Sequence, residues 1–154
     1  MINEISIRGA GRDDAFELAA LLGRLGYPTD PATVVARLGR LEATGLDQVL
    51  VAETDEQVVG LASMHITPAL LHREGPMARI TAMVVDESRT RQGVGRRLVA
   101  AVEELARAAG CVGVEVSSNT RRADAHAFYA ALGYTRSHEL FRKPLEVTGI
   151  GDRG

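Results

Sequence analysis

The residues best placed to do chemistry form a polar, basic turn between an apolar stretch and a helical one. The turn holds two glycines and three arginines in the run Arg89, Thr90, Arg91, Gln92, Gly93, Val94, Gly95 and Arg96. A strand that ends in such a turn at a helix N-terminus points several backbone N–H groups into one space, where the helix dipole favours an anion. The turn is therefore a candidate phosphate cradle. On spacing alone, an ordinary strand-to-helix connection whose glycines serve only the turn is the alternative.

The periodicity of apolar residues predicts the elements that position this turn. Residues 78–85 predict a central strand before it, and the apolar stripe from Val94 to Ala109 predicts a helix after it, ended by Gly110. Residues 112–116 then predict another strand. A strand, a helix and a strand in this order favour a parallel crossover.

The remaining elements complete one sheet. Before the central strand we expect a strand at 4–8, a helix capped by Asp13 or Asp14, a helix starting at Pro31 and capped by Thr29 or Asp30, and a hairpin of residues 49–53 and 58–66. After it we expect a helix at 121–132 and strands at 134–138 and 140–144. The expected fold class is α/β (α+β): a mixed, mainly antiparallel sheet of six to seven strands with a central parallel pair and helices on both faces.

Length and composition narrow the classes of protein to consider. The 154 residues fit a single domain, 1–145, followed by a loose tail, 146–154. A formal charge of −2 gives no reason to invoke nucleic acid. We find neither the pattern of a signal peptide nor an apolar run approaching ~18 residues, so no membrane association and a cytoplasmic location are expected.

Cysteine and histidine give no sign of a metal site. Cys111 is the only cysteine, so no internal disulfide and no multi-cysteine metal site can form. The four histidines are scattered rather than set at the spacing of metal ligands. We therefore expect no metal.

Two segments together resemble the GNAT family of N-acetyltransferases, over residues 4–145. The turn matches the family's Q/R-x-x-G-x-G/A loop at Gly93 and Gly95, with Thr90 in place of the usual first residue. Asn119 and the stretch from Ala127 to Tyr134 resemble the second segment, N-x(n)-FY-x-x-x-GF/Y. The resemblance implies acetyl-CoA as donor and an amine of a small molecule or a peptide as acceptor, with a monomer or homodimer as the assembly.

The resemblance also implies roles for single residues. Main chain of Met83, Val84 and Val85 would hold the donor and polarise its thioester carbonyl. The turn would hold the pyrophosphate, with added charge from Arg89, Arg91 and Arg96. Asn119 would contact the pantetheine region, although a plain helix cap is an equal alternative for it. Tyr129 would protonate the leaving thiolate, as its phenol, with a pKa near ~10, is protonated at neutral pH.

The general base is less clear. Family members often carry an acid on the strand before the loop, and residues 79–83 have none. Glu115, on the next strand, and Glu53, at the end of another strand, are the candidates, and a solvent-facing role is the alternative for each.

Other classes remain as alternatives. A dinucleotide-binding oxidoreductase fits poorly, because Leu98 stands where the third glycine of its fingerprint would be. No Gly-Lys-Ser/Thr follows, which argues against a Walker-type NTPase. A non-catalytic acyl-CoA sensor or partner-binding module would keep the donor site and lack the base. The sequence leaves open the acceptor, the base, the oligomeric state and the acyl group.

Overall fold

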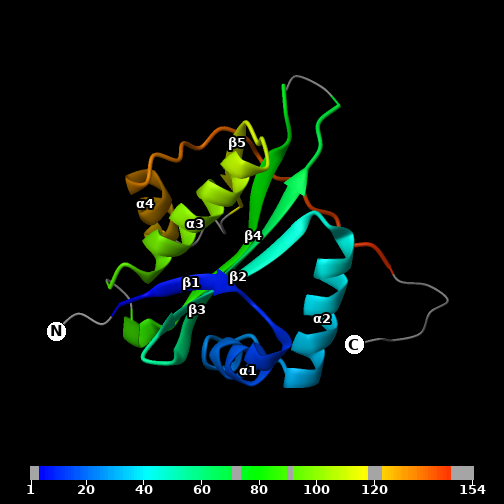
Figure 1. Ribbon diagram of the computed structural model, residues 1–154. Helices are drawn as coiled ribbons and strands as arrows, with labels where there is room; N and C mark the ends of the chain where they lie inside the picture. Colours follow the sequence, from blue (N-terminus) through cyan, green and yellow to red (C-terminus); the bar gives the residue numbers. More distant parts are fainter. Residues whose placement is uncertain (1–3, 71–73, 90–91, 118–122, 147–154) are drawn as a thin grey trace. The chain divides into compact units, whose positions relative to one another are not determined.

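Five strands form a single sheet in the first part of the chain (Figure 1). The computed structural model describes residues 4–70, 74–89, 92–117 and 123–146, and it divides into one unit up to Val116 and another from Ser117 onward. The described strands of the first unit are β1 (Ser6–Gly9), β2 (Asp47–Thr54), β3 (Gln57–Thr67), β4 (Met77–Val85) and β5 (Gly113–Val116), and they lie side by side in that order.

The pairing of these strands confirms the predicted hairpin and crossover. The strands from β1 to β4 pair antiparallel, and the β2–β3 hairpin turns through Asp55 and Glu56, both with positive φ. β4 and β5 pair parallel across the intervening helix. Among the described residues, however, the parallel pair stands at the edge of the sheet rather than at its centre.

Helices cover both faces of this sheet, as predicted. α1 (Ala15–Arg24) and α2 (Pro31–Thr44) lie on one face, and α3 (Val94–Ala108) lies on the other (Figure 1). Leu18 and Leu21 of α1 pack with Val51 and Leu61 of the sheet on the first face. On the second face α3 buries one apolar stripe: Val94, Leu98, Val99, Val102 and Ala106. In the ranges described, we find no helix with the length and apolar character needed to span a membrane.

The starts of the first two helices show how local sequence sets their bounds. Asp30 caps α2, since its Oδ1 accepts a hydrogen bond from the Thr33 N–H at 2.7 Å and Pro31 follows at the first helical position. Asp14 precedes α1 without capping it. Its carboxylate instead accepts bonds from the Arg8 guanidinium at 2.9 and 2.8 Å, which hold the pKa of Asp14 below its ordinary value. Asp14 therefore fastens β1 to the helix.

The second unit holds α4 (Ala123–Ala131), and the strands predicted after it are wrong. Residues 134–138 and 140–144 form no strand, so the described part of the chain has five strands and not six to seven. Leu140 and Phe141 of the second segment are 58% and 87% exposed, and Leu145, which follows it, is 81% exposed. Strand propensity records how side chains fit a paired, half-buried surface, and without a partner strand it does not produce one.

The contact between α3 and the sheet gives a first testable prediction. A Cβ added at Gly60 would lie 3.0 Å from Val94 Cγ1, 3.1 Å from the Val84 carbonyl oxygen and 3.2 Å from Leu98 Cδ1. These distances are shorter than the ~3.5–4.0 Å of favourable packing, so Gly60→Ala should lower the free energy of unfolding by about 1–3 kcal/mol.

Gly39→Ala is the matched control for this substitution. Gly39 lies in the exposed interior of α2 with no neighbour within 4 Å of an added Cβ. Alanine there should raise the free energy of unfolding by about 0.5–1 kcal/mol, because it favours the helix. Urea denaturation of both variants measures the contrast. Equal effects at the two positions would contradict the close packing of α3 on β3.

Candidate active site

A β-bulge in β4 lies beside an open edge of the sheet. Ser63 of β3 pairs with Ala82, but the next residue, Met64, pairs with Ile80, which leaves Thr81 as an extra residue in β4. On the other side, β5 pairs with β4 only as far as Ile80 and Val116. From Thr81 to Val85, therefore, no strand among the described residues pairs with the outer edge of β4.

The register shows which amides face this open edge. The Asp86 N–H donates to the Val59 carbonyl of β3 at 2.8 Å. Because backbone groups alternate along a strand, the Val84 N–H also points toward β3, and those of Met83 and Val85 point outward. Two N–H donors thus line an edge that an extended ligand can pair with.

The N-terminus of α3 follows β4 and has the character of an anion site. Gly93 is its N-cap, with φ +85°, a conformation that glycine adopts without strain, and no side chain in the described ranges caps the helix. The first turn carries no acidic residue but holds Arg96 and Arg97. Cations are unfavourable at this end of a helix dipole, so an anion here would offset both the dipole and the arginines.

Hydrogen bonds fix the connection between β4 and α3. Asp86 accepts bonds from the N–H and Oγ of Ser88 at 3.0 and 2.9 Å, and it pairs with Arg24 of α1 at 3.1 Å. The Ser88 N–H is the main cause that lowers the pKa of Asp86. The Arg89 N–H donates to the Asp86 carbonyl at 2.8 Å. Gln92 is exposed, and Thr90, Arg91 and Asn119 lie outside the described residues.

Four ionisable side chains form a row across the face that carries α1 and α2. We call Asp47, His65, Arg79 and Glu115 the polar row, because each pairs in register with the next on β2, β3, β4 and β5. His65 Nδ1 lies 3.0 Å from Asp47 Oδ1, and Arg79 Nε donates to Glu115 Oε1 at 3.1 Å. The row ends one residue before β4 and β5 cease to pair, next to the open edge.

Sequence reasoning found only Glu115 of this row. The alternation of β4 would place Arg79 on the face opposite Val84, and the extra residue at Thr81 reverses this. The strand register that aligns Asp47 with His65 also depends on long-range pairing. No motif in the chain signals either contact.

Tyr129 lies in α4 of the second unit and is buried among aromatic rings. It is 8% exposed, and its ring meets Phe128 and Tyr134 edge-on at centroid distances of 5.0 and 5.6 Å. Burial raises the pKa of the Tyr129 phenol. Because its ordinary pKa is near ~10, the phenol keeps its proton throughout the neutral range.

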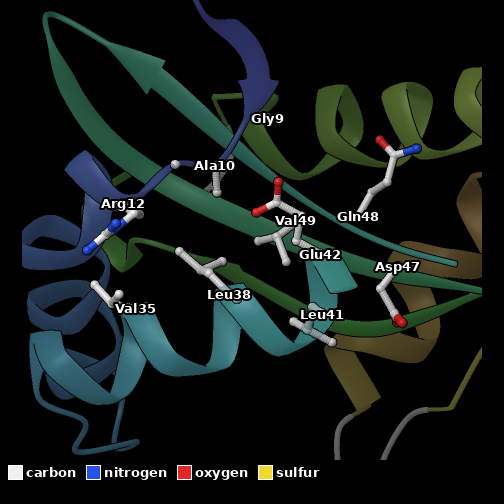
Figure 2. A pocket seen from close by; sticks show the side chains of 12 residues that line it. Gly9, Ala10, Arg12, Val35, Leu38, Leu41, Glu42, Asp47, Gln48 and Val49 are labelled. Carbon is white, nitrogen blue, oxygen red and sulfur yellow. The ribbon is translucent and has the colours of Figure 1, made fainter. Parts of the chain in front are cut away.

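A separate hollow of about 660 Å³ lies between α2, residues 9–12 and the start of β2 (Figure 2). Val35 and Leu38 give it an apolar wall, and Arg12 and Glu42 add charge. β3 lies between its β2 wall and the open edge of β4. The hollow therefore lies away from the bulge and the N-terminus of α3, although Asp47 of the polar row is one of its lining residues.

Comparison with known proteins identifies the family. The Acetyltransferase (GNAT) family matches residues 15–134. An aminoalkylphosphonate N-acetyltransferase of Salmonella typhimurium is 40% identical over 89 residues, which cover 58% of this chain and 57% of that protein. The chain thus spans little more than half of that relative.

Two further comparisons agree over nearly the whole chain. An aminoglycoside N(6')-acetyltransferase type 1 of Stenotrophomonas maltophilia is 30% identical, covering 92% of this chain and 94% of that protein. The structure of an aminoglycoside N-acetyltransferase in complex with CoA shares the fold, with a TM-score of 0.82 at 16% identity over 94% of this chain and 97% of that one. The chain belongs to the GNAT family of acetyltransferases, as the resemblance predicted.

Proposed function

We propose that the protein transfers the acetyl group of acetyl-CoA to an amine of a small molecule. The observation that carries this proposal is the open edge of β4, followed along the chain by the N-terminus of α3, where Gly93 provides no side-chain cap. An extended ligand that ends in a phosphate group fits this arrangement, because outward N–H groups of β4 are followed by the N–H groups at the start of α3. The names of two relatives add support, because one acts on aminoalkylphosphonates and the other on aminoglycosides.

The donor would be held by main chain more than by side chains. The outward amides of Met83 and Val85 would pair with the pantetheine arm and stabilise negative charge on the thioester oxygen. Amides of the first turn of α3, after Gly93, would hold the pyrophosphate. Arg89, Arg91 and Arg96 would add positive charge there, and Asn119 would contact the arm. Acetyl-CoA supplies the activated acetyl thioester.

Two proton movements complete the transfer. The acceptor nitrogen loses a proton and forms the new C–N bond with the acetyl carbon, while the C–S bond breaks and the thiolate takes up a proton. Glu115 is the proposed base for the amine, and its contact with Arg79 keeps the carboxylate beside the open edge. Tyr129 is the proposed acid for the thiolate. This acid role rests on the family motif and on the buried, protonated phenol.

Thermal stability with and without acetyl-CoA tests the donor. At about 100 times its Kd, acetyl-CoA should stabilise the fold by about 2.7 kcal/mol and raise Tm by roughly 5–10 °C, and NADH should leave Tm unchanged. A rise with NADH alone would contradict the proposal.

Thiol release against a panel of amines then separates an enzyme from a sensor. An N-acetyltransferase releases thiol only when a suitable amine is present. A non-catalytic sensor would show the Tm shift without turnover on any amine.

A further inference from the structure

The end of the polar row at β4 and β5 has the chemistry of a two-part recognition site. Arg79 and Glu115 lie on neighbouring strands, joined by the single Nε–Oε1 contact of 3.1 Å, and each side chain is 41% exposed. The pair stands one residue before β4 and β5 stop pairing. A cation and an anion are therefore fixed side by side at the edge where the proposed function places the acetyl group.

The contact with Glu115 leaves most of Arg79 available. A guanidinium has five N–H donors in a planar fork, and Glu115 takes only the one on Nε. Among the residues described, no other hydrogen-bond partner of Arg79 is found. Its Nη atoms can thus bind a planar or tetrahedral acid, such as a carboxylate or a phosphonate, through two parallel bonds.

The rest of the row does not compete for this guanidinium. Asp47, the acid at the other end of the row, lies against His65 and accepts a 2.6 Å bond from Thr44 Oγ1. The Asp47 side chain is 8% exposed. The Asp47 carboxylate already has these two hydrogen-bond partners. An acid that binds Arg79 would therefore not have to displace the Asp47 carboxylate.

We infer that Arg79 and Glu115 select acceptors that carry an acidic group close to the reacting amine. The inference rests on the proposed function, since it places the amine at Glu115 and the acid at the Nη atoms of Arg79. With hydrogen-bond lengths of about 3 Å at each end, the two groups of the acceptor are joined by about one to three carbons. Polycationic amines would bring like charge to Arg79 and are disfavoured.

A comparison of acceptors on the unmodified protein tests this inference. With acetyl-CoA as donor, kcat/KM for 2-aminoethylphosphonate and for β-alanine should exceed that for propylamine by roughly 10-fold to 100-fold, mainly through a lower KM. Kanamycin, a polycationic amine, should be the poorest acceptor. Equal kcat/KM for propylamine, or kanamycin as the best acceptor, would overturn the inference.

Variants of Arg79 test whether this side chain causes the preference for acceptors with an acidic group. Arg79→Met should reduce the ratio of kcat/KM for 2-aminoethylphosphonate to that for propylamine by about 10-fold, and Arg79→Lys should keep part of it. The ratio cancels any effect on the base or on folding that both acceptors share. Arg107→Met is the matched control, because it breaks the exposed Arg107–Glu104 pair on α3. It should leave the ratio unchanged, whereas an equal fall in Arg107→Met would contradict a specific role for Arg79.

The outcomes also separate this inference from the proposed function. If acetyl-CoA neither raises Tm nor releases thiol with any amine, the proposed function fails. If acetyl-CoA is consumed with amines regardless of an acidic group, the proposed function stands and the selection by Arg79 fails.

Discussion

We expect Tyr129→Phe to lower kcat by about 100-fold and to change the Kd for acetyl-CoA by less than about twofold from that of the unmodified protein. The substitution removes only the hydroxyl, so the ring still packs edge-on against Phe128 and Tyr134. Without the phenol, the thiolate leaves unprotonated or takes a proton from water. Steady-state kinetics and calorimetric titration of acetyl-CoA measure the two quantities.

The dependence of kcat on pH gives a second test of Tyr129 as the proposed acid. Burial raises the pKa of Tyr129, and an acid works only while it is protonated. Its ordinary pKa is near ~10, so loss of activity through Tyr129 begins only above about pH 10. At neutral pH the phenol is fully available.

Tyr134→Phe is the control for the proposed acid. It removes a hydroxyl from the neighbouring ring and keeps the aromatic contact. We expect kcat to stay within about twofold of the unmodified protein. Undiminished kcat in Tyr129→Phe, or equal losses in both variants, would remove Tyr129 from the mechanism.

Leu98→Ala should cost about 3–5 kcal/mol of the free energy of unfolding, the largest stability effect that we predict. The Leu98 side chain is fully buried, at 0% exposure, where α3 packs on the sheet beside Gly60. The loss is a large part of the ~5–15 kcal/mol that holds a typical domain together. It also loosens the helix whose N-terminus is the proposed pyrophosphate site.

Leu70→Ala is the matched control, as Leu70 is 95% exposed. It should change the free energy of unfolding by less than about 0.5 kcal/mol. Urea denaturation at 25 °C compares the two leucines. A loss below about 1 kcal/mol in Leu98→Ala would mean that α3 contributes little to the core.

Much of the fold could be predicted because its signals are local. The cap at Asp30, the apolar stripe of α3 and the hairpin between β2 and β3 each depend on residues close in the chain. The parallel pairing of β4 and β5 followed from the helix between them. These elements form where local conformation and burial favour the same state.

Two features could not be predicted, because each depends on a partner far away in the sequence. The segment 134–144 has the composition of strands, but it pairs with no strand among the residues that the structure describes, so it adds none to their sheet. The extra residue at Thr81 is visible only in the register of β4 against β3. That one residue moves Arg79 to the face of Glu115 and His65.

The sequence by itself determined the family and the segment expected to hold the donor. Glycines at a helix start and a tyrosine segment act within a few residues of chain, so their spacing is enough to recognise them. Only the tertiary structure forms the polar row, which we propose as the acceptor side, because Asp47, His65, Arg79 and Glu115 come from four strands. Strand register brings them into one row, and register is set by packing across the whole sheet.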